Sequence, residues 1–194
     1  NLVFVNTGLE YPEIQKFVNE YAGWLRREFP RVTVNLHRLR PKINIREVVR
    51  KYGYSIVSKE VAAYVEEARV KPDGQSAARL RGEYLRKDGE PSAYNCEKWA
   101  FLLCAPFAIS SRCCAVMKKK PMNAYMRKTQ RVPTMATMAQ ESRLRTKVWL
   151  KNGCNAFEGK HPAGKPMSFW TEQDVLRFIV DRHIPLSQAS TAKS

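Results

Sequence analysis

The fold is decided by residues 2–13, LVFVNTGLEYPE, near the start of the chain. The first four residues are apolar, and Asn-Thr-Gly follows them directly, which predicts a buried strand that ends in a turn. Pro12 suits the first turn of a helix, and apolar residues continue at helical spacing as far as Leu25. The stretch therefore predicts a strand, a turn and an amphipathic helix.

The same alternation is repeated further along the chain. Residues 32–36 predict a second strand, and the apolar residues of 45–52 predict a second helix that ends at Gly53. Strand, helix, strand and helix in succession indicate an α/β fold with a parallel sheet. Further elements are predicted as helices after Ser58, in 97–103, 113–128 and 141–150, and after Thr171 in a capping box, with a third strand in 132–139.

The length of 194 residues suits a single domain spanning residues 1–194. Residues 71–92 are rich in Gly, Pro and charge, which predicts an exposed loop or insertion. No apolar run has the length of a membrane span, so we expect a cytoplasmic protein without a membrane partner. The chain starts at Asn1 immediately before a strand, and we therefore expect a piece of a longer protein.

The formal net charge of +16 predicts an anionic partner such as a nucleotide, a sulfate ester or a nucleic acid. The charge is uneven, because residues 112–151 hold eleven Lys or Arg residues and a single acidic residue, Glu141. A solvated basic face would have the same composition. The charge alone therefore does not choose between these partners or establish a site.

Two strand-to-helix turns are candidate anion sites. Thr7 and Gly8 follow the first strand, where ligands bind in open α/β sheets and where the next helix presents its N-terminal amides. Glu141, Ser142 and Arg145 follow the predicted third strand; Ser142 can cap the helix or donate to a phosphate, and an arginine binds phosphate or sulfate with two donors. Turns of this kind also occur for structural reasons alone.

The sequence SSRCCAVMKKKP, residues 110–121, places two adjacent cysteines before three lysines. The odd total of five cysteines, without signs of secretion, favours reduced thiols or metal ligands. Adjacent cysteines are poorly placed to form a disulfide with each other, and iron–sulfur clusters usually take four thiolates. Without further information, two packed thiols beside a solvated lysine run are the preferred interpretation of Cys113 and Cys114.

Five segments together resemble the phosphoadenosine phosphosulfate (PAPS) reductase family, in the order of that family's motifs. They are VFVNTGLEYPE (3–13), similar to D-T-G-x-x-[FY]-P-E; YSIVSKEVA (54–62); ISSRCCAVMKKKP (109–121), similar to the cysteine-pair region; ATMAQESRLR (136–145), similar to E-S-x-x-R; and KPMSFWTEQDVLRFI (165–179), similar to P-[LM]-x-x-W-[TS]-x-x-D-V. The set covers nearly the whole chain and resembles bacterial and phage-type members.

The resemblance implies a Rossmann-like parallel sheet flanked by helices, as in the adenine nucleotide alpha-hydrolases. Members of the family reduce PAPS or adenosine phosphosulfate (APS) to sulfite in sulfate assimilation, with thioredoxin as electron donor. The resemblance further implies that Thr7 and Gly8 line the nucleotide site, and that Glu141, Ser142 and Arg145 lie near the phosphate or sulfate.

Cys113 and Cys114 match the first half of the family's Cys-Cys…Cys-x-x-Cys motif, which holds a [4Fe-4S] cluster in many members, and Cys154 is a weaker candidate for a third ligand. This sequence lacks the second half of the motif, the S-G-G-x-D-S phosphate loop and the catalytic cysteine of the family. Asn6 also replaces the usual Asp, and Ala136 stands where Gly is common.

The resemblance therefore predicts the nucleotide-binding core of a sulfonucleotide reductase-like enzyme without its nucleophile. One alternative is a nucleic-acid-modifying sulfurtransferase or ATP pyrophosphatase of the same fold. The other is a non-catalytic nucleotide-binding or interaction module.

Overall fold

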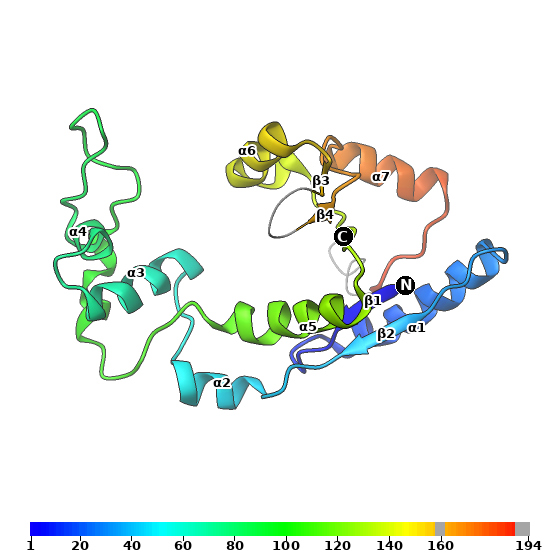
Figure 1. Cartoon of the computed structure of the whole chain (residues 1–194), viewed down its shortest axis with the longest axis horizontal. Helices are drawn as coiled ribbons and strands as arrows, with labels where there is room; N and C mark the ends of the chain where they lie inside the picture. Colours follow the sequence, from blue (N-terminus) through cyan, green and yellow to red (C-terminus); the bar gives the residue numbers. More distant parts are fainter. Residues whose placement is uncertain (158–161, 189–194) are drawn as a thin grey trace. The chain divides into compact units, whose positions relative to one another are not determined.

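The computed structural model describes residues 1–157 and 162–188 (Figure 1). The chain divides into two compact units. The terminal unit comprises Asn1–Phe4, Glu10–His37 and Asn123–Ser194, and the central unit comprises Val5–Leu9 and Arg38–Met122. The single domain expected from the sequence stays a prediction. Each unit is described by itself.

A small parallel sheet pairs β1 (Leu2–Val5) with β2 (Leu36–Leu39). The Leu2 amide donates to the Asn35 carbonyl and the Asn6 amide to the Leu39 carbonyl, both at 2.8 Å, so the two strands run in the same direction. The predicted parallel pairing is confirmed. The second strand begins at Leu36 and not at Val32, because the Val32 amide is bonded to the Phe29 carbonyl in a turn after the first helix.

The strand predicted at 132–139 is wrong, because most of these residues do not form a strand. Only Thr134 is paired there, in an isolated parallel bridge with Gly164. Gly164 also belongs to a two-stranded antiparallel sheet of β3 (Asn155–Ala156) and β4 (Ala163–Gly164). The described residues therefore form a mixed α/β structure with little sheet, in which the strands are short.

Helices make up most of the terminal unit. Helix α1 (Pro12–Glu28) has Pro at its start, as predicted, and its one fully buried residue is Ala22. A row of half-buried aromatic rings, Phe17, Tyr21 and Trp24, runs along it with centroids 5.6 and 5.5 Å apart. Later elements are the 3₁₀ helix η3 (Ala139–Glu141), α6 (Arg143–Asn152) and α7 (Glu172–Asp181).

The central unit is built around α3 (Lys59–Val70), α4 (Gln75–Arg81) and the 3₁₀ helix η1 (Glu97–Cys104). Its apolar core consists of buried side chains from these elements and from Ile109: Val61, Ala62, Val65, Ala68, Ala77, Leu80 and Leu102. Helix α2 (Ile45–Tyr52) ends at Gly53, as the sequence predicts, and it begins at an Asn44 capping box that was not predicted. Ser58 likewise caps α3 through the Val61 amide.

Residues 71–92 differ from the predicted exposed loop. Gly74, in an extended conformation, starts α4, and Ser76, Ala77 and Leu80 are buried on the side that faces α3 and η1. The pattern is hard to detect because only seven residues form the helix and three of them are small. The part after Gly82 is largely exposed, as predicted.

A helix begins at Cys113 and continues to Thr129, in the region predicted as helical. Its second turn is a π-helical segment, η2 (Ala115–Lys119), and the remainder is α5 (Lys120–Thr129). Val116 and Met117 are buried against Val48, and Cys113 packs at the edge of this small cluster. Throughout the described ranges, no helix combines the length and the apolar character needed to cross a membrane.

Candidate functional site

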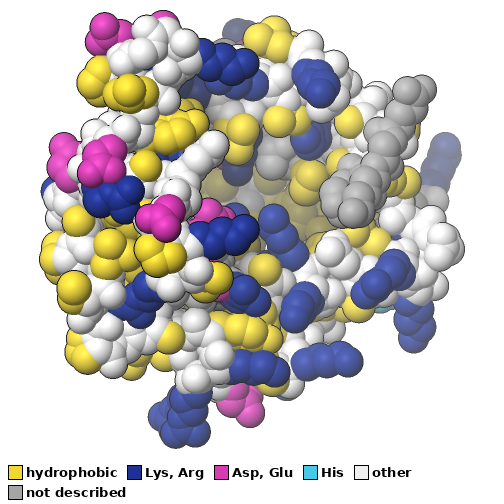
Figure 2. Space-filling view, turned by 60° about the vertical axis from the view of Figure 1, so that its left-hand side comes forward, with side chains coloured by type: hydrophobic (Ala, Val, Ile, Leu, Met, Phe, Trp, Pro, Cys, Tyr) yellow, Lys and Arg dark blue, Asp and Glu magenta, His cyan; other side chains and the backbone are white. Residues whose placement is uncertain are grey.

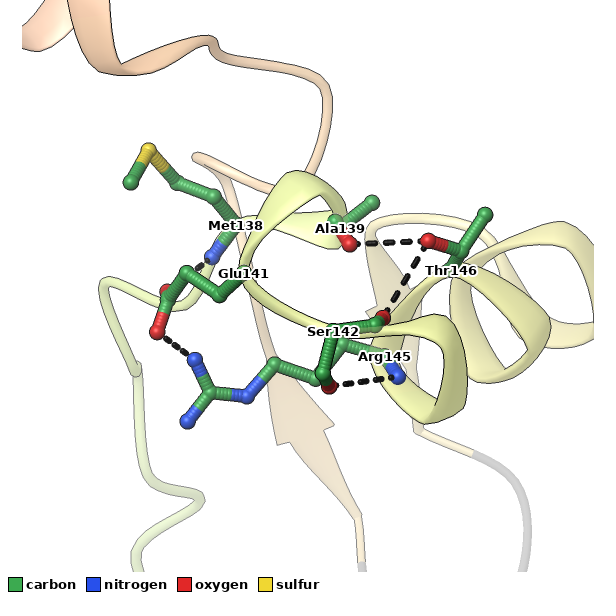
Figure 3. Close-up of polar contacts among 6 residues, drawn as sticks. All are labelled: Met138, Ala139, Glu141, Ser142, Arg145 and Thr146. Atoms are coloured by element: carbon green, nitrogen blue, oxygen red, sulfur yellow. Dashed lines mark hydrogen bonds and ion pairs between the residues drawn. The ribbon is translucent and has the colours of Figure 1, made fainter.

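The start of α6 forms a compact polar corner, which we call the Ser142 corner and define as Glu141, Ser142 and Arg145 (Figure 3). Ser142 has extended backbone angles, and its Oγ accepts a hydrogen bond from the Arg145 amide at 3.3 Å. Serine favours this position because its short side chain reaches a backbone amide that has no partner within the helix. The predicted helix start and its cap are therefore present.

Glu141 holds Arg145 in place. One carboxylate oxygen, Oε2, forms an ion pair with Nη1 of Arg145 one turn later, and the other, Oε1, accepts from the Met138 amide at 2.8 Å. The remaining guanidinium donors, Nε and Nη2, have no partner among the described residues, and the Arg145 side chain is 44% exposed. An arginine fixed on one side in this manner presents its other donors to an oxyanion.

Hydrogen bonds anchor the corner to the rest of the terminal unit. The Thr146 hydroxyl donates to the Ala139 carbonyl at 2.8 Å, which ties η3 to α6. The Ala139 amide donates to the carbonyl of buried Ser168 at 2.8 Å, and the Glu172 amide donates to Oε1 of Gln140 at 3.1 Å. Thr146 is not among the predicted residues; its spacing from Ser142 indicates only its second bond, in which the hydroxyl donates to the Ser142 carbonyl at 3.2 Å.

Thr7 and Gly8, predicted to line an anion site, lie in the turn that follows β1. Gly8 has φ +82°, its amide donates to Oδ1 of Asn6 at 2.9 Å, and Thr7 is buried. A Cβ at Gly8 would meet no atom within 4 Å, so the backbone conformation, rather than crowding within the chain, calls for glycine. Thr7 and Gly8 belong to the central unit and the Ser142 corner to the terminal unit. Their membership of one site stays a prediction.

The cysteines are free thiols in different surroundings. Cys114 is exposed, and Cys113 is half-buried beside Val116 and Met117 in the central unit, whereas Cys154 belongs to the terminal unit. In residues 1–157 and 162–188, no group of three or more His, Cys, Asp or Glu side chains could hold a metal ion. Two adjacent thiols are half of a four-thiolate set, so the described residues do not complete a cluster site.

Exposed basic side chains lie close in sequence to the cysteine pair. Figure 2 shows Lys and Arg over much of the visible face, with Asp and Glu fewer there. Lys118, Lys119 and Lys120 are exposed on the helix that begins at Cys113. Arg112, just before that helix, is held by Glu66, whose Oε1 lies 2.6 Å from its Nε.

The sequence matches no protein-family model and, at a significant level, no curated protein.

Proposed function

We propose that this chain is the nucleotide-binding core of a sulfonucleotide reductase-like protein with a Rossmann-like fold, and that the Ser142 corner binds the phosphate or sulfate of PAPS or APS. The observation that carries the proposal is the fixed guanidinium of Arg145 at a capped helix start. The segment ATMAQESRLR resembles the corresponding motif of the PAPS reductases, and the parallel strand pair with its Thr7-Gly8 turn agrees with that fold.

The chemistry of such a site is mainly electrostatic. In the parent reaction a thiolate attacks the sulfur of the bound sulfonucleotide, the bond from sulfur to the phosphate oxygen breaks, and AMP or its 3′-phosphate leaves. Arg145 would bind the oxygens on which negative charge increases, and the amides at the start of α6 would add their dipoles. Because this sequence lacks the family's catalytic cysteine, the contribution proposed for this chain is binding and orientation of the nucleotide.

The test compares two arginines of the same helix. Arg145→Ala should weaken the binding of adenosine 3′,5′-bisphosphate about tenfold or more, because a charge-assisted pair of hydrogen bonds is lost. Arg143→Ala is the matched control, since Arg143 is exposed on α6 and removes the same charge outside the corner. Binding is measured by calorimetry and helix content by circular dichroism. Equal affinity of the two variants would rule out the role of Arg145.

A [4Fe-4S] cluster stays part of the proposal through Cys113 and Cys114, with Cys154 as the weaker candidate for a third ligand. The described residues do not supply the other two ligands, and we derive no reaction step through a cluster. Anaerobic purification followed by iron and sulfide analysis decides the matter: about four of each per chain, lost in Cys113→Ser, would make these thiols ligands. An iron-free protein would leave them as structural thiols.

A nucleic-acid-modifying enzyme of the same fold is a second candidate, favoured by α6 itself. Arg143, Lys147 and Lys151 follow one another at intervals of four residues, which places them on one face of the helix, about 6 Å apart along its axis. All three are exposed, and none forms an ion pair with another residue in the described part of the chain. Such a row of cations suits a phosphate backbone.

Salt dependence distinguishes this candidate from the first. Replacing Arg143, Lys147 and Lys151 together by Gln should lower the slope of log K against log salt for duplex DNA by about 3. Replacing Lys118, Lys119 and Lys120 by Gln removes the same charge from another helix and is the control. An identical slope in both variants would exclude α6 as the nucleic-acid surface. Absence of affinity for nucleotide and for nucleic acid would support a non-catalytic interaction module.

A further inference from the structure

The central unit contains a polar hollow that the Ser142 corner does not involve. It lies between α3, α4 and the segment that leads to Cys113, and its volume is about 620 Å³. Polar and charged side chains line much of it, among them Glu66, Glu67, Ser76, Arg79 and Arg112. A volume of this size is within the range of small-molecule sites. All the lining residues belong to the central unit.

Arg79 is the most constrained of the lining residues. Its guanidinium lies between two aromatic rings, with Cζ 4.9 Å from the Tyr64 centroid and 4.4 Å from the Tyr84 centroid. Its Nε is buried and has no hydrogen-bond partner among the described residues. A buried donor without a partner costs free energy, so an oxyanion that reached this guanidinium would reduce that cost.

The neighbouring tyrosine does not neutralise this cation. The Tyr64 hydroxyl donates to Oε1 of Glu60 at 2.7 Å, which fixes the ring. Burial, followed by this hydrogen bond, raises the pKa of Tyr64 to about 12. The phenol is therefore neutral at physiological pH and acts on Arg79 through its ring face.

The carboxylates in the hollow are engaged elsewhere. Glu66 accepts from Nε of Arg112 at 2.6 Å and from the Ser111 amide at 3.4 Å. Glu67 accepts from the Ser76 hydroxyl at 2.6 Å. Within the described ranges, neither carboxylate forms an ion pair with Arg79, and Lys71 adds a further cation to the lining. The charged residues of the lining, Glu66, Glu67, Lys71, Arg79 and Arg112, therefore have a net positive charge.

We propose that this hollow binds a small molecule carrying a phosphate or carboxylate group, and that Arg79 holds that group. The two rings fix the guanidinium before binding, so little side-chain freedom is lost when two of its donors meet two oxygens of the ligand. The site lies in the other unit from the Ser142 corner and does not depend on the proposed function.

The experiment follows the Arg79 Nε–H signal by ¹⁵N NMR in the full chain. The signal is assigned by through-bond correlations within the Arg79 side chain. Titration with inorganic phosphate and, separately, with acetate should give a saturable shift of this signal and slow its exchange with water. A shift with phosphate alone identifies a phosphorylated ligand, and a shift with acetate alone identifies a carboxylate. No saturable shift with either anion would overturn the proposal, leaving Nε to a water molecule.

Two variants locate the effect. Arg79→Gln should weaken the binding of the effective anion in the central unit about tenfold, read from the shifts of the Ser76 and Ser111 amides. Arg81→Gln is the matched control: Arg81 is on the same helix and pairs with Glu83 outside the lining. If Arg81→Gln weakens binding equally, the overall positive charge of the helix, and not Arg79 itself, accounts for anion binding and the proposal fails. Loss of phosphate binding only in Arg145→Ala would refute this site while supporting the Ser142 corner.

Discussion

The core around α3 and α4 and the corner at the start of α6 are stabilised in different ways. In the core, side chains distant in sequence bury one another, and Arg69 donates to the carbonyls of Leu102, Ala105 and Phe107 at 2.7–2.9 Å. Helix α6 has no buried residue, and its start depends on bonds between residues a few positions apart. Burial therefore dominates the first region and local hydrogen bonding the second, which sets the size of the effects expected from mutation.

The largest effect is expected at Gly53, where two backbone segments of the central unit meet. Gly53 has φ +97°, and a Cβ there would lie 2.3 Å from the Ala108 carbonyl oxygen, which accepts from the Tyr54 amide. Gly53→Ala should therefore lower the free energy of unfolding by about 3 kcal/mol or more. Gly8→Ala is the control, with a similar positive φ and no contact within 4 Å, and should cost about 1 kcal/mol. Equal losses in urea denaturation would show that the close approach to Ala108 is unimportant.

The next effect compares two leucines. Leu80 is fully buried in α4, whereas Leu144 in α6 is 73% exposed. Leu80→Ala should cost about 2–5 kcal/mol, because it leaves a cavity among packed side chains, and Leu144→Ala should change stability by less than about 0.5 kcal/mol. Thermal and denaturant unfolding measure both. A loss of several kcal/mol in Leu144→Ala would mean that α6 packs against further structure, and the contrast between the regions would fail.

A smaller effect is expected from the cap of α6. Ser142→Ala removes the acceptor for the Arg145 amide and should cost about 1 kcal/mol. Ser142→Asp keeps an acceptor there and should retain stability, while its negative charge should weaken nucleotide binding at Arg145. The pair thus separates the structural role of Ser142 from its role in binding. If Ser142→Asp binds nucleotide as tightly as the unaltered protein, the ligand does not approach this corner.

The smallest effect concerns pH and Asp174. The hydrogen bond from the Thr171 amide, followed by that from the Thr171 hydroxyl, holds the pKa of the Asp174 carboxyl below its usual value of 3.8. Its contribution to stability is therefore complete above that value and is lost as pH falls through the lower pKa of the folded state. Asp174→Asn should destabilise the protein slightly at neutral pH, and the difference should vanish in strong acid. An Asp174→Asn variant with the same pH dependence of stability as the unaltered protein would show that the Thr171 hydrogen bonds do not lower the pKa of Asp174.

Local signals account for what the sequence predicts well. Caps at Ser58, Ser142 and Thr171 act within three residues, so the starts of α3, α6 and α7 follow from local spacing. The parallel pairing of β1 and β2 is also predicted, because an apolar run followed by a helix favours it, although residues 2–5 are half-buried and not buried as predicted. The Ser142 corner is a local motif of the same kind.

Local sequence patterns do not predict the features that depend on contacts between distant residues. Helix α4 lies in a stretch whose composition is typical of a loop, and only burial against α3 and η1 stabilises Ala77 and Leu80 there. The position of Arg79 between Tyr64 and Tyr84 involves residues fifteen and five positions away, and no periodicity links them. Instead of the strand expected at 132–139, the structure has a single bridge at Thr134, because no other strand pairs with the rest of this segment.

The π-helical turn Ala115–Lys119 also has an evolutionary consequence. A π turn accommodates one more residue than an α turn, so it has the geometry of a single-residue insertion within a regular helix. Homologues with an uninterrupted α-helix here should be one residue shorter between the cysteine pair and Pro121. In them, each side chain after the gap would keep its face of the helix although its number changes by one. Alignments of this region therefore need a gap inside the helix, and matching the lysines without it would pair residues from different faces.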